Sequence, residues 1–130
     1  MEQAEKAYSE GRILIMHFSN QWEYIFIEKY GDLYQSNPNM FLRHFDSSYA
    51  ERDRDLYNDY MAIVKQWGDG LEKLQDRGIS VLCPAFGEMT SHPCFRAYSK
   101  EGKEHFKNIW RQLFAYLVEE RGLNNILFGY

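Results

Sequence analysis

The order of apolar and helical patterns along the 130 residues predicts an α/β fold built on a parallel sheet. Short apolar runs at residues 13–18, 79–83 and 126–128 are typical of buried strands. Amphipathic helical patterns separate these runs, and Gly11, Gly78 and Gly122 follow the helical segments, where left-handed caps are expected. Because parallel strands need a long crossover connection, this alternation favours about three consecutive parallel strands with flanking helices.

The first third of the chain predicts one helix, one strand and a long irregular segment. Residues 1–10 are polar and compatible with a helix that ends before Gly11. The continuous apolar run at 13–18 is the pattern of a strand buried on both faces. Residues 21–48 scatter seven aromatic side chains around the turn signal Asn37-Pro38-Asn39. We expect this segment to be a long loop with one short helix.

Two longer helices follow from apolar residues spaced three and four apart. The first covers residues 54–77, and Gly68 and Gly70 in its middle predict a kink or a split. The second carries its apolar stripe from Phe106 to Leu117 and ends before Gly122. Trp67 and Trp110 lie on these stripes and are expected in the core.

Composition excludes several classes of function. The net charge is −4 with interspersed charges, so no basic stripe is present to neutralise phosphates, and nucleic acid is not expected as a partner. No apolar run approaches the ~20 residues of a membrane span, and the acidic N-terminus does not resemble a signal peptide. Cys83 and Cys94 are expected as free thiols. His92 beside these cysteines matches no structural zinc spacing, so no metal or cofactor is expected.

The strand count suggests that the chain is a piece of a larger domain. Three strands with two-sided apolar patterns leave long unpaired edges, which finished proteins avoid. We therefore expect residues 1–130 to form a single partial domain.

Three segments resemble glycoside hydrolase family 26, the β-mannanases and their relatives. Residues 81–89, VLCPAFGEM, are similar without a gap to the family's acid/base strand, VLFRPFHEM. Residues 106–130, with Trp110-Arg111 and the final GLNNILFGY, resemble the helix and strand that follow in the family. Residues 11–18 are similar to the strand before a substrate-site histidine, for which His17 is the nearest candidate. The sequence departs from the family at Pro84-Ala85, at Gly87 and in a reduced aromatic run after residue 89.

The resemblance implies a partial (β/α)8 barrel that hydrolyses β-linked polysaccharide, with β-1,4-mannan as the expected substrate. The family cleaves with retention of configuration, which needs one acid/base carboxyl and one nucleophilic carboxylate. Glu88 matches the acid/base, and its place just after a strand is where barrel enzymes carry catalytic groups. The family's nucleophile lies on a later strand, beyond residue 130, so the isolated chain is expected to be inactive. The spacing of Asp46 and Asp53 supports neither as a substitute, and Asp46 is expected in a loop near the site or in solvent.

Four aromatic residues are candidates for stacking on sugar rings: Trp22, Tyr24, Phe95 and Tyr98. Packing within loops is an equally good interpretation of all four. Tyr130 aligns with a family residue at the end of its strand and is a further candidate for a side chain that faces the site. Asn124-Asn125 is expected to form a helix-to-strand turn. Many relatives of the family are secreted or attached to the cell surface. The alternatives are another retaining barrel glycosidase, such as a xylanase or glucanase, and a non-catalytic carbohydrate-binding or interaction module.

Overall fold

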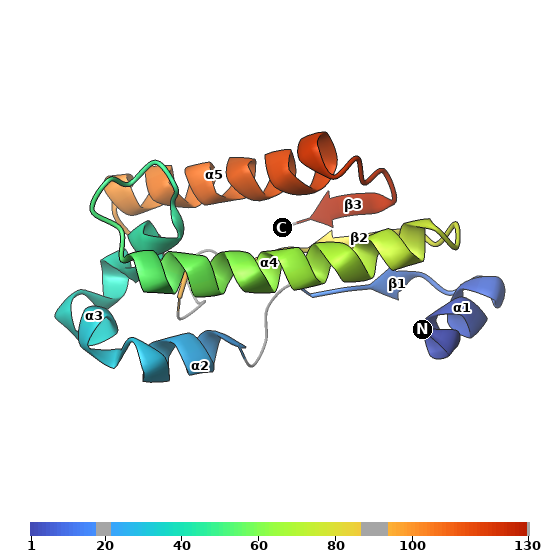
Figure 1. Cartoon of the computed structure of the whole chain (residues 1–130), viewed down its shortest axis with the longest axis horizontal. Coiled ribbons are helices and arrows are strands. Elements are labelled where there is room, and N and C mark those ends of the chain that lie inside the picture. Colours follow the sequence, from blue (N-terminus) through green and yellow to red (C-terminus); the bar gives the residue numbers. More distant parts are fainter. Residues whose placement is uncertain (18–21, 87–93, 130) are drawn as a thin grey trace.

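A computed structural model describes residues 1–17, 22–86 and 94–129, with the side chain of Trp22 left out. The elements are, in order, α1 (Glu2–Ser9), β1 (Leu14–Ile15), α2 (Trp22–Lys29), α3 (Gly31–Ser36), η1 (Pro38–Phe45), α4 (Arg54–Gln75), β2 (Val81–Pro84), α5 (Lys100–Phe114), η2 (Ala115–Glu120) and β3 (Ile126–Gly129) (Figure 1).

The three strands form one parallel sheet in the order β1-β2-β3, which confirms the predicted α/β arrangement. Leu14 pairs with Val81, which in turn pairs with Ile126. Because crossovers between parallel strands are right-handed, this sequential order places α4 and α5 on the same face of the sheet. Gly11, Gly78 and Gly122 have φ values of +77°, +68° and +69°, so the predicted left-handed caps are confirmed.

Capping side chains fix where the two long helices begin. The Asp53 side chain accepts a hydrogen bond from the Leu56 backbone N–H at 2.9 Å, and Ser99 Oγ accepts one from Gly102 N–H at 2.9 Å. The apolar stripe of α4 is buried from Leu56 to Leu74. The helix continues from Arg54 to Gln75, so the predicted kink or split at Gly68 and Gly70 is wrong. Packing along the whole buried stripe outweighs the weak helix propensity of two glycines.

Residues 22–45 differ from the sequence prediction of a long loop with one short helix. This segment contains α2, α3 and the 3-10 helix η1. The aromatic residues in it are what holds the short helices together: the Phe41 ring lies 5.6 Å from the Phe45 ring, which lies 5.4 Å from the Phe26 ring. The contact between Phe26 and Phe45 joins two different helices, so it gives no periodic signal within either of them.

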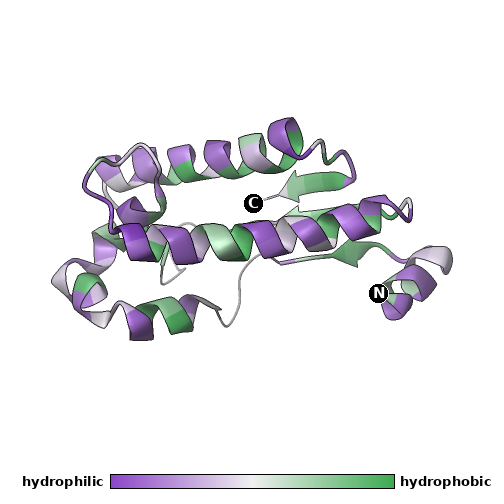
Figure 2. Cartoon of the chain, viewed as in Figure 1, coloured by the Kyte–Doolittle hydropathy of each residue, from purple (hydrophilic) through white to green (hydrophobic). Residues whose placement is uncertain are grey.

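The strands were predicted to be buried on both faces, and this is wrong for β1 and β3. On the face under the helices, Val81 and Cys83 are 2% and 0% exposed. On the opposite face, Leu82 pairs with Ile15 on one side and with Leu127 on the other. The Ile15 side chain is 56% exposed and that of Leu127 is 69% exposed. Figure 2 shows that β1 and β3 are nonetheless hydrophobic. We call the face that carries Ile15, Leu82 and Leu127 the open face; no other layer covers it within the described residues.

The tryptophans of the long helices contact the core from its edge. Trp67 and Trp110 are partly buried and pack against the core cluster, which agrees with the prediction in part. Within the part of the chain that the structure describes, none of the helices combines the length and the apolar character needed to span a membrane.

Candidate functional site

The C-terminal ends of the three strands lie along one edge of the sheet. Pro84 at the end of β2 pairs with Gly129 at the end of β3, and the Met16 N–H, just past β1, donates to the Leu82 carbonyl at 2.9 Å. The segments that leave these strands therefore start side by side. This is the edge at which open and closed α/β sheets carry their ligands and catalytic groups.

Glu88 follows β2 by four residues and lies outside the described residues, as do Gly87 and His92. The described residues on either side of this segment belong to the core. Phe86 is 2% exposed, Phe95 is 0% exposed, and their ring centroids are 4.6 Å apart. The segment that carries Glu88 thus starts and ends at neighbouring points of the core.

The structure places Phe95, a predicted sugar-stacking residue, in the core. Its ring packs between those of Phe86 and Phe45, at centroid distances of 4.6 and 4.9 Å. With no exposed ring face in this arrangement, Phe95 fits the packing interpretation rather than sugar stacking. The physical reason is that Phe95 follows directly on Cys94, which is also fully buried.

Two other candidates are exposed at the strand ends or close to the start of α5. His17, two residues past β1, is exposed. Tyr98 is 53% exposed and precedes Ser99, the N-cap of α5. The side chain of Trp22, which begins α2, and the whole of Tyr130 lie outside the described residues.

A buried acid that the sequence analysis missed lies in the first turn of α2. Glu23 is 4% exposed, and its backbone carbonyl accepts a hydrogen bond from the Cys94 thiol at 3.5 Å. This contact ties α2, which follows β1, to the residues that follow the Glu88 segment. Glu23 has no neighbouring motif that would have marked it as buried.

Cys83 and Cys94 are free, as predicted, and both are buried. Burial raises the pKa of the Cys83 thiol to about 12 and also raises that of Cys94, where the Glu23 charge adds to the effect. Because the thiolate is the reactive form, neither cysteine is suited to nucleophilic chemistry.

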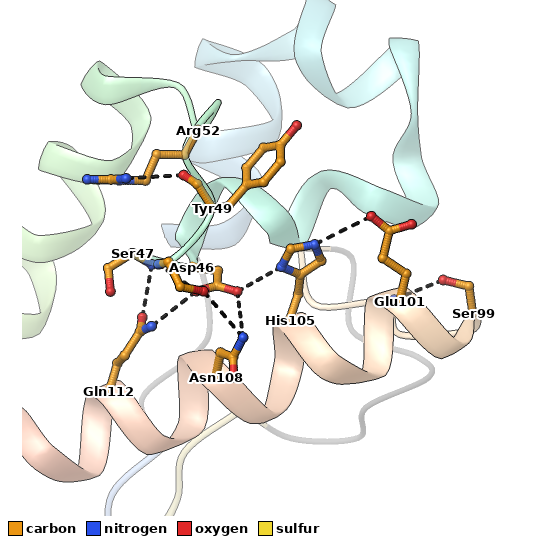
Figure 3. A network of polar contacts seen from close by, with 11 residues as sticks. Asp46, Ser47, Tyr49, Arg52, Ser99, Glu101, His105, Asn108 and Gln112 are labelled. Atoms are coloured by element: carbon orange, nitrogen blue, oxygen red, sulfur yellow. Dashed lines mark hydrogen bonds and ion pairs between the residues drawn. The ribbon is translucent and has the colours of Figure 1, made fainter.

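Asp46 forms the centre of a polar network between the loop before α4 and helix α5 (Figure 3). Its carboxylate is 0% exposed, which contradicts the expectation of a solvated side chain. The Oδ1 atom accepts hydrogen bonds from Ser48 N–H at 2.9 Å, Ser48 Oγ at 2.6 Å and Gln112 Nε2 at 3.1 Å. The Oδ2 atom contacts His105 Nδ1 at 2.7 Å and accepts from Asn108 Nδ2 at 3.1 Å.

These contacts fix the ionisation state of Asp46. Burial alone would raise its pKa, but the hydrogen bonds from Ser48, His105 and Asn108 outweigh burial and lower the pKa to about 2. A carboxylate with both oxygens occupied and so low a pKa anchors a loop and does not act as a nucleophile or proton donor. The polar spacing of His105, Asn108 and Gln112 on one side of α5 is the sequence signal that would have revealed it.

A second polar cluster joins η2 to α4. Arg121 Nη2 lies 2.6 Å from both Asp69 Oδ1 and Glu72 Oε2. The guanidinium crosses α4 at Gly68, where an added Cβ would lie 2.9 Å from Arg121 Nη1. In the loop beyond, Asn125 donates to the carbonyls of Leu71 and Ile79, which supports its predicted role in a turn. Both sets of contacts are structural.

The sequence of the chain can be compared with the sequences of known proteins. The glycosyl hydrolase family 26 model matches residues 3–130, almost the whole chain. The chain belongs to this family. The resemblance noted at residues 81–89 and 106–130 is thereby confirmed.

A curated relative supports the same assignment. A mannan endo-1,4-beta-mannosidase from Bacillus subtilis is 28% identical over 75 residues, covering 53% of this chain and 21% of the relative. The matched stretch is therefore about a fifth of that enzyme. No solved structure matched the family 26 chain.

Proposed function

We propose that this family 26 chain is part of a glycoside hydrolase that cleaves β-linked polysaccharide, with β-1,4-mannan as the substrate. Membership of the family over residues 3–130 carries the proposal. The similarity to a mannan endo-1,4-beta-mannosidase favours mannan over the xylan and glucan alternatives.

Glu88 is the residue we assign to the acid/base step of a retaining mechanism. As general acid it gives its proton to the leaving glycosidic oxygen; as general base it then takes a proton from the incoming water. Two features support this assignment: its match to the acid/base motif, and the described strand β2, which ends four residues earlier at the catalytic edge. A second carboxylate, supplied by polypeptide outside these residues, acts as the nucleophile. Two carboxylates suffice for this chemistry, so no cofactor takes part.

The fold that we propose for the complete domain is a (β/α)8 barrel, of which residues 1–130 form one part. The open face supports this proposal, because barrel interiors are filled by apolar side chains from the other strands. A hollow of about 520 Å³ on that face is lined by Ile13, Leu82 and Leu127 among others. In a barrel, His17, Trp22, Tyr98 and Tyr130 belong to segments at the catalytic mouth and are our candidates for contacts with the polysaccharide.

Hydrolysis of mannan by the purified chain gives the first test. We expect no reducing sugar to be released, because removing one of two cooperating catalytic groups costs orders of magnitude in rate. Release of reducing sugar by the isolated chain, abolished in Glu88→Gln, would contradict the assignment of the nucleophile to other polypeptide.

A fusion protein in which this chain replaces the matching segment of the Bacillus subtilis mannosidase tests the role of Glu88. We expect Glu88→Gln to lower kcat/KM on mannan by about 10²–10⁴-fold. Cleavage of a dinitrophenyl mannoside should fall much less in its first step, since that leaving group needs no proton. Glu104→Gln, an exposed acid on α5, is the matched control. Equal losses on both substrates would exclude Glu88 as the general acid.

A further inference from the structure

A groove of about 320 Å³ lies between α4 and the end of α5. Both helices belong to the layer that covers the sheet (Figure 1). Its floor includes the buried residues Tyr60, Val64 and Leu113. Tyr57 from α4 and Tyr116 from η2 also line it. The volume is at the lower end of the range for small-ligand sites, about 300–1,000 Å³. Of the candidates that the structure describes at the strand ends, neither His17 nor Tyr98 lines this groove.

Both of these tyrosine rings are held in place by an arginine. The Arg52 guanidinium lies over the Tyr57 ring, 4.8 Å from its centroid. Arg121 lies 5.9 Å from the Tyr116 centroid and donates to the Tyr116 hydroxyl at 3.3 Å. Arg121 is itself fixed by Asp69 and Glu72. Rings that are already ordered lose little conformational entropy when a ligand packs against them.

The backbone at Tyr116 is also unusual. Residues Ala115–Glu120 form a π-helical turn that follows α5 directly. Such turns are rare and occur frequently at functional sites, because the wider turn displaces side chains from the regular helical positions. Here the π-helical turn carries one tyrosine and one acid of the groove, Tyr116 and Glu120.

The polar groups of the groove indicate what kind of ligand it fits. Ser47 and Glu120 are exposed, and the Gln112 side chain is oriented by Ser47 N–H at 3.0 Å and by Asp46. Among the described lining residues there is one carboxylate and no lysine or arginine. This balance disfavours phosphates and acidic ligands and suits a neutral polyol. Aromatic rings with an apolar face and a polar edge suit the two sides of a pyranose.

We propose that this groove is a second, non-catalytic binding site for one or two pyranose units of a neutral polysaccharide. The choice of a mannan chain as the ligand rests on the proposed function. The shape and charge of the groove are independent of that proposal. The site holds the polymer on the helical layer and leaves the catalytic edge free for another part of the same chain.

The test is a titration of the isotopically labelled chain with mannotetraose, followed residue by residue in amide NMR spectra. We expect concentration-dependent shifts at Ser47, Tyr57, Gln112 and Tyr116. Tyr57→Leu should weaken binding at these positions by about tenfold, because it removes an aromatic contact while keeping an apolar side chain. Tyr57→Phe should keep most of the affinity. Tyr8→Leu, a partly exposed tyrosine on α1, is the matched control, and thermal unfolding checks that each variant is folded.

The outcomes separate this proposal from the proposed function. Shifts at the groove with cellotetraose but not mannotetraose would support the groove and count against mannan as the substrate. Mannan hydrolysis by the fusion protein together with an unshifted groove would overturn the second site alone. Shifts at the groove that persist in a folded Tyr57→Leu variant would also overturn it.

Discussion

The two faces of the three-stranded sheet differ in how completely they are covered. On the side under α4 and α5, Val81 and Cys83 are sealed from solvent, and even a carboxylate, Asp46, is buried between the loop and α5 with five polar contacts. On the open face, Ile15 and Leu127 remain largely exposed. Within the described residues, the helices bury one face of the sheet. The other face exposes apolar side chains, which folded proteins normally cover.

The largest expected effect tests the polar contacts of the covered side. At about pH 7 we expect Asp46→Asn to lower the free energy of unfolding by about 2–3 kcal/mol, because the charge that five contacts stabilise is lost. Asp32→Asn, at an exposed acid in the first turn of α3, should change it by less than about 0.5 kcal/mol. Urea unfolding measures both.

The pH dependence of the same variant gives a second readout. The pKa of Asp46 is lowered in the folded state from 3.8 to about 2, so its contribution is complete above about pH 4 and is lost as the pH falls towards 2. The lowered pKa corresponds to about 2.5 kcal/mol. The difference between wild type and Asp46→Asn should therefore shrink between about pH 4 and about pH 2. A difference that stays constant over this range would show that the carboxylate charge is not what stabilises the loop.

A matched pair of substitutions compares the two faces directly. Val81→Thr places a hydroxyl on the sealed face and should lower the free energy of unfolding by about 1–3 kcal/mol. Ile15→Thr makes a similar change on the open face and should cost less than about 0.5 kcal/mol, since the position is already hydrated. Chemical denaturation of the two variants gives the comparison. Equal costs would mean that the open face is covered in solution, for example by a second copy of the chain, and sedimentation would then reveal a dimer.

The smallest effect concerns the surface of the covering helix α4. An added Cβ at Gly70 meets nothing within 4 Å, so Gly70→Ala should raise stability by about 0.5–1 kcal/mol through helix propensity alone. Gly68→Ala should not give this gain, because its Cβ would lie 2.9 Å from Arg121 Nη1 and would displace the guanidinium from Asp69 and Glu72. Thermal unfolding of both variants tests the pair; the same gain in both would show that Arg121 adjusts without loss.

The sequence predicts the parts of this molecule that depend on local pattern. Neighbouring residues alone predict three features: the apolar runs of the strands, the apolar spacing along α4 and α5, and the three glycine caps. These predictions are confirmed. The short helices between residues 22 and 45 were missed because aromatic contacts across that segment, rather than a periodic stripe, stabilise them. The exposure of Ile15 was missed because an apolar run does not reveal whether a second layer is present.

The sequence offers a candidate site only where a motif marks it. The acid/base motif points to Glu88, and the family 26 match covers the residues that contain this motif. The role of Glu88 stays a prediction. Asp46 and Glu23 contact partners 59 or more residues away, at His105 and Cys94, and the residues next to either acid do not reveal such contacts. For Asp46 the signal lies on the partner helix, in the polar spacing along α5. Phe95 is a related case. An aromatic residue near a motif can belong to the core or to a ligand site, and the sequence alone does not distinguish the two.

The contact between the rings of Phe86 and Phe95 has a practical consequence for engineering. Because each ring packs on the other, truncating either one removes a contact on both sides of the residues that lie between them. Variants of this family 26 chain should therefore keep both rings, together with β2 and α5.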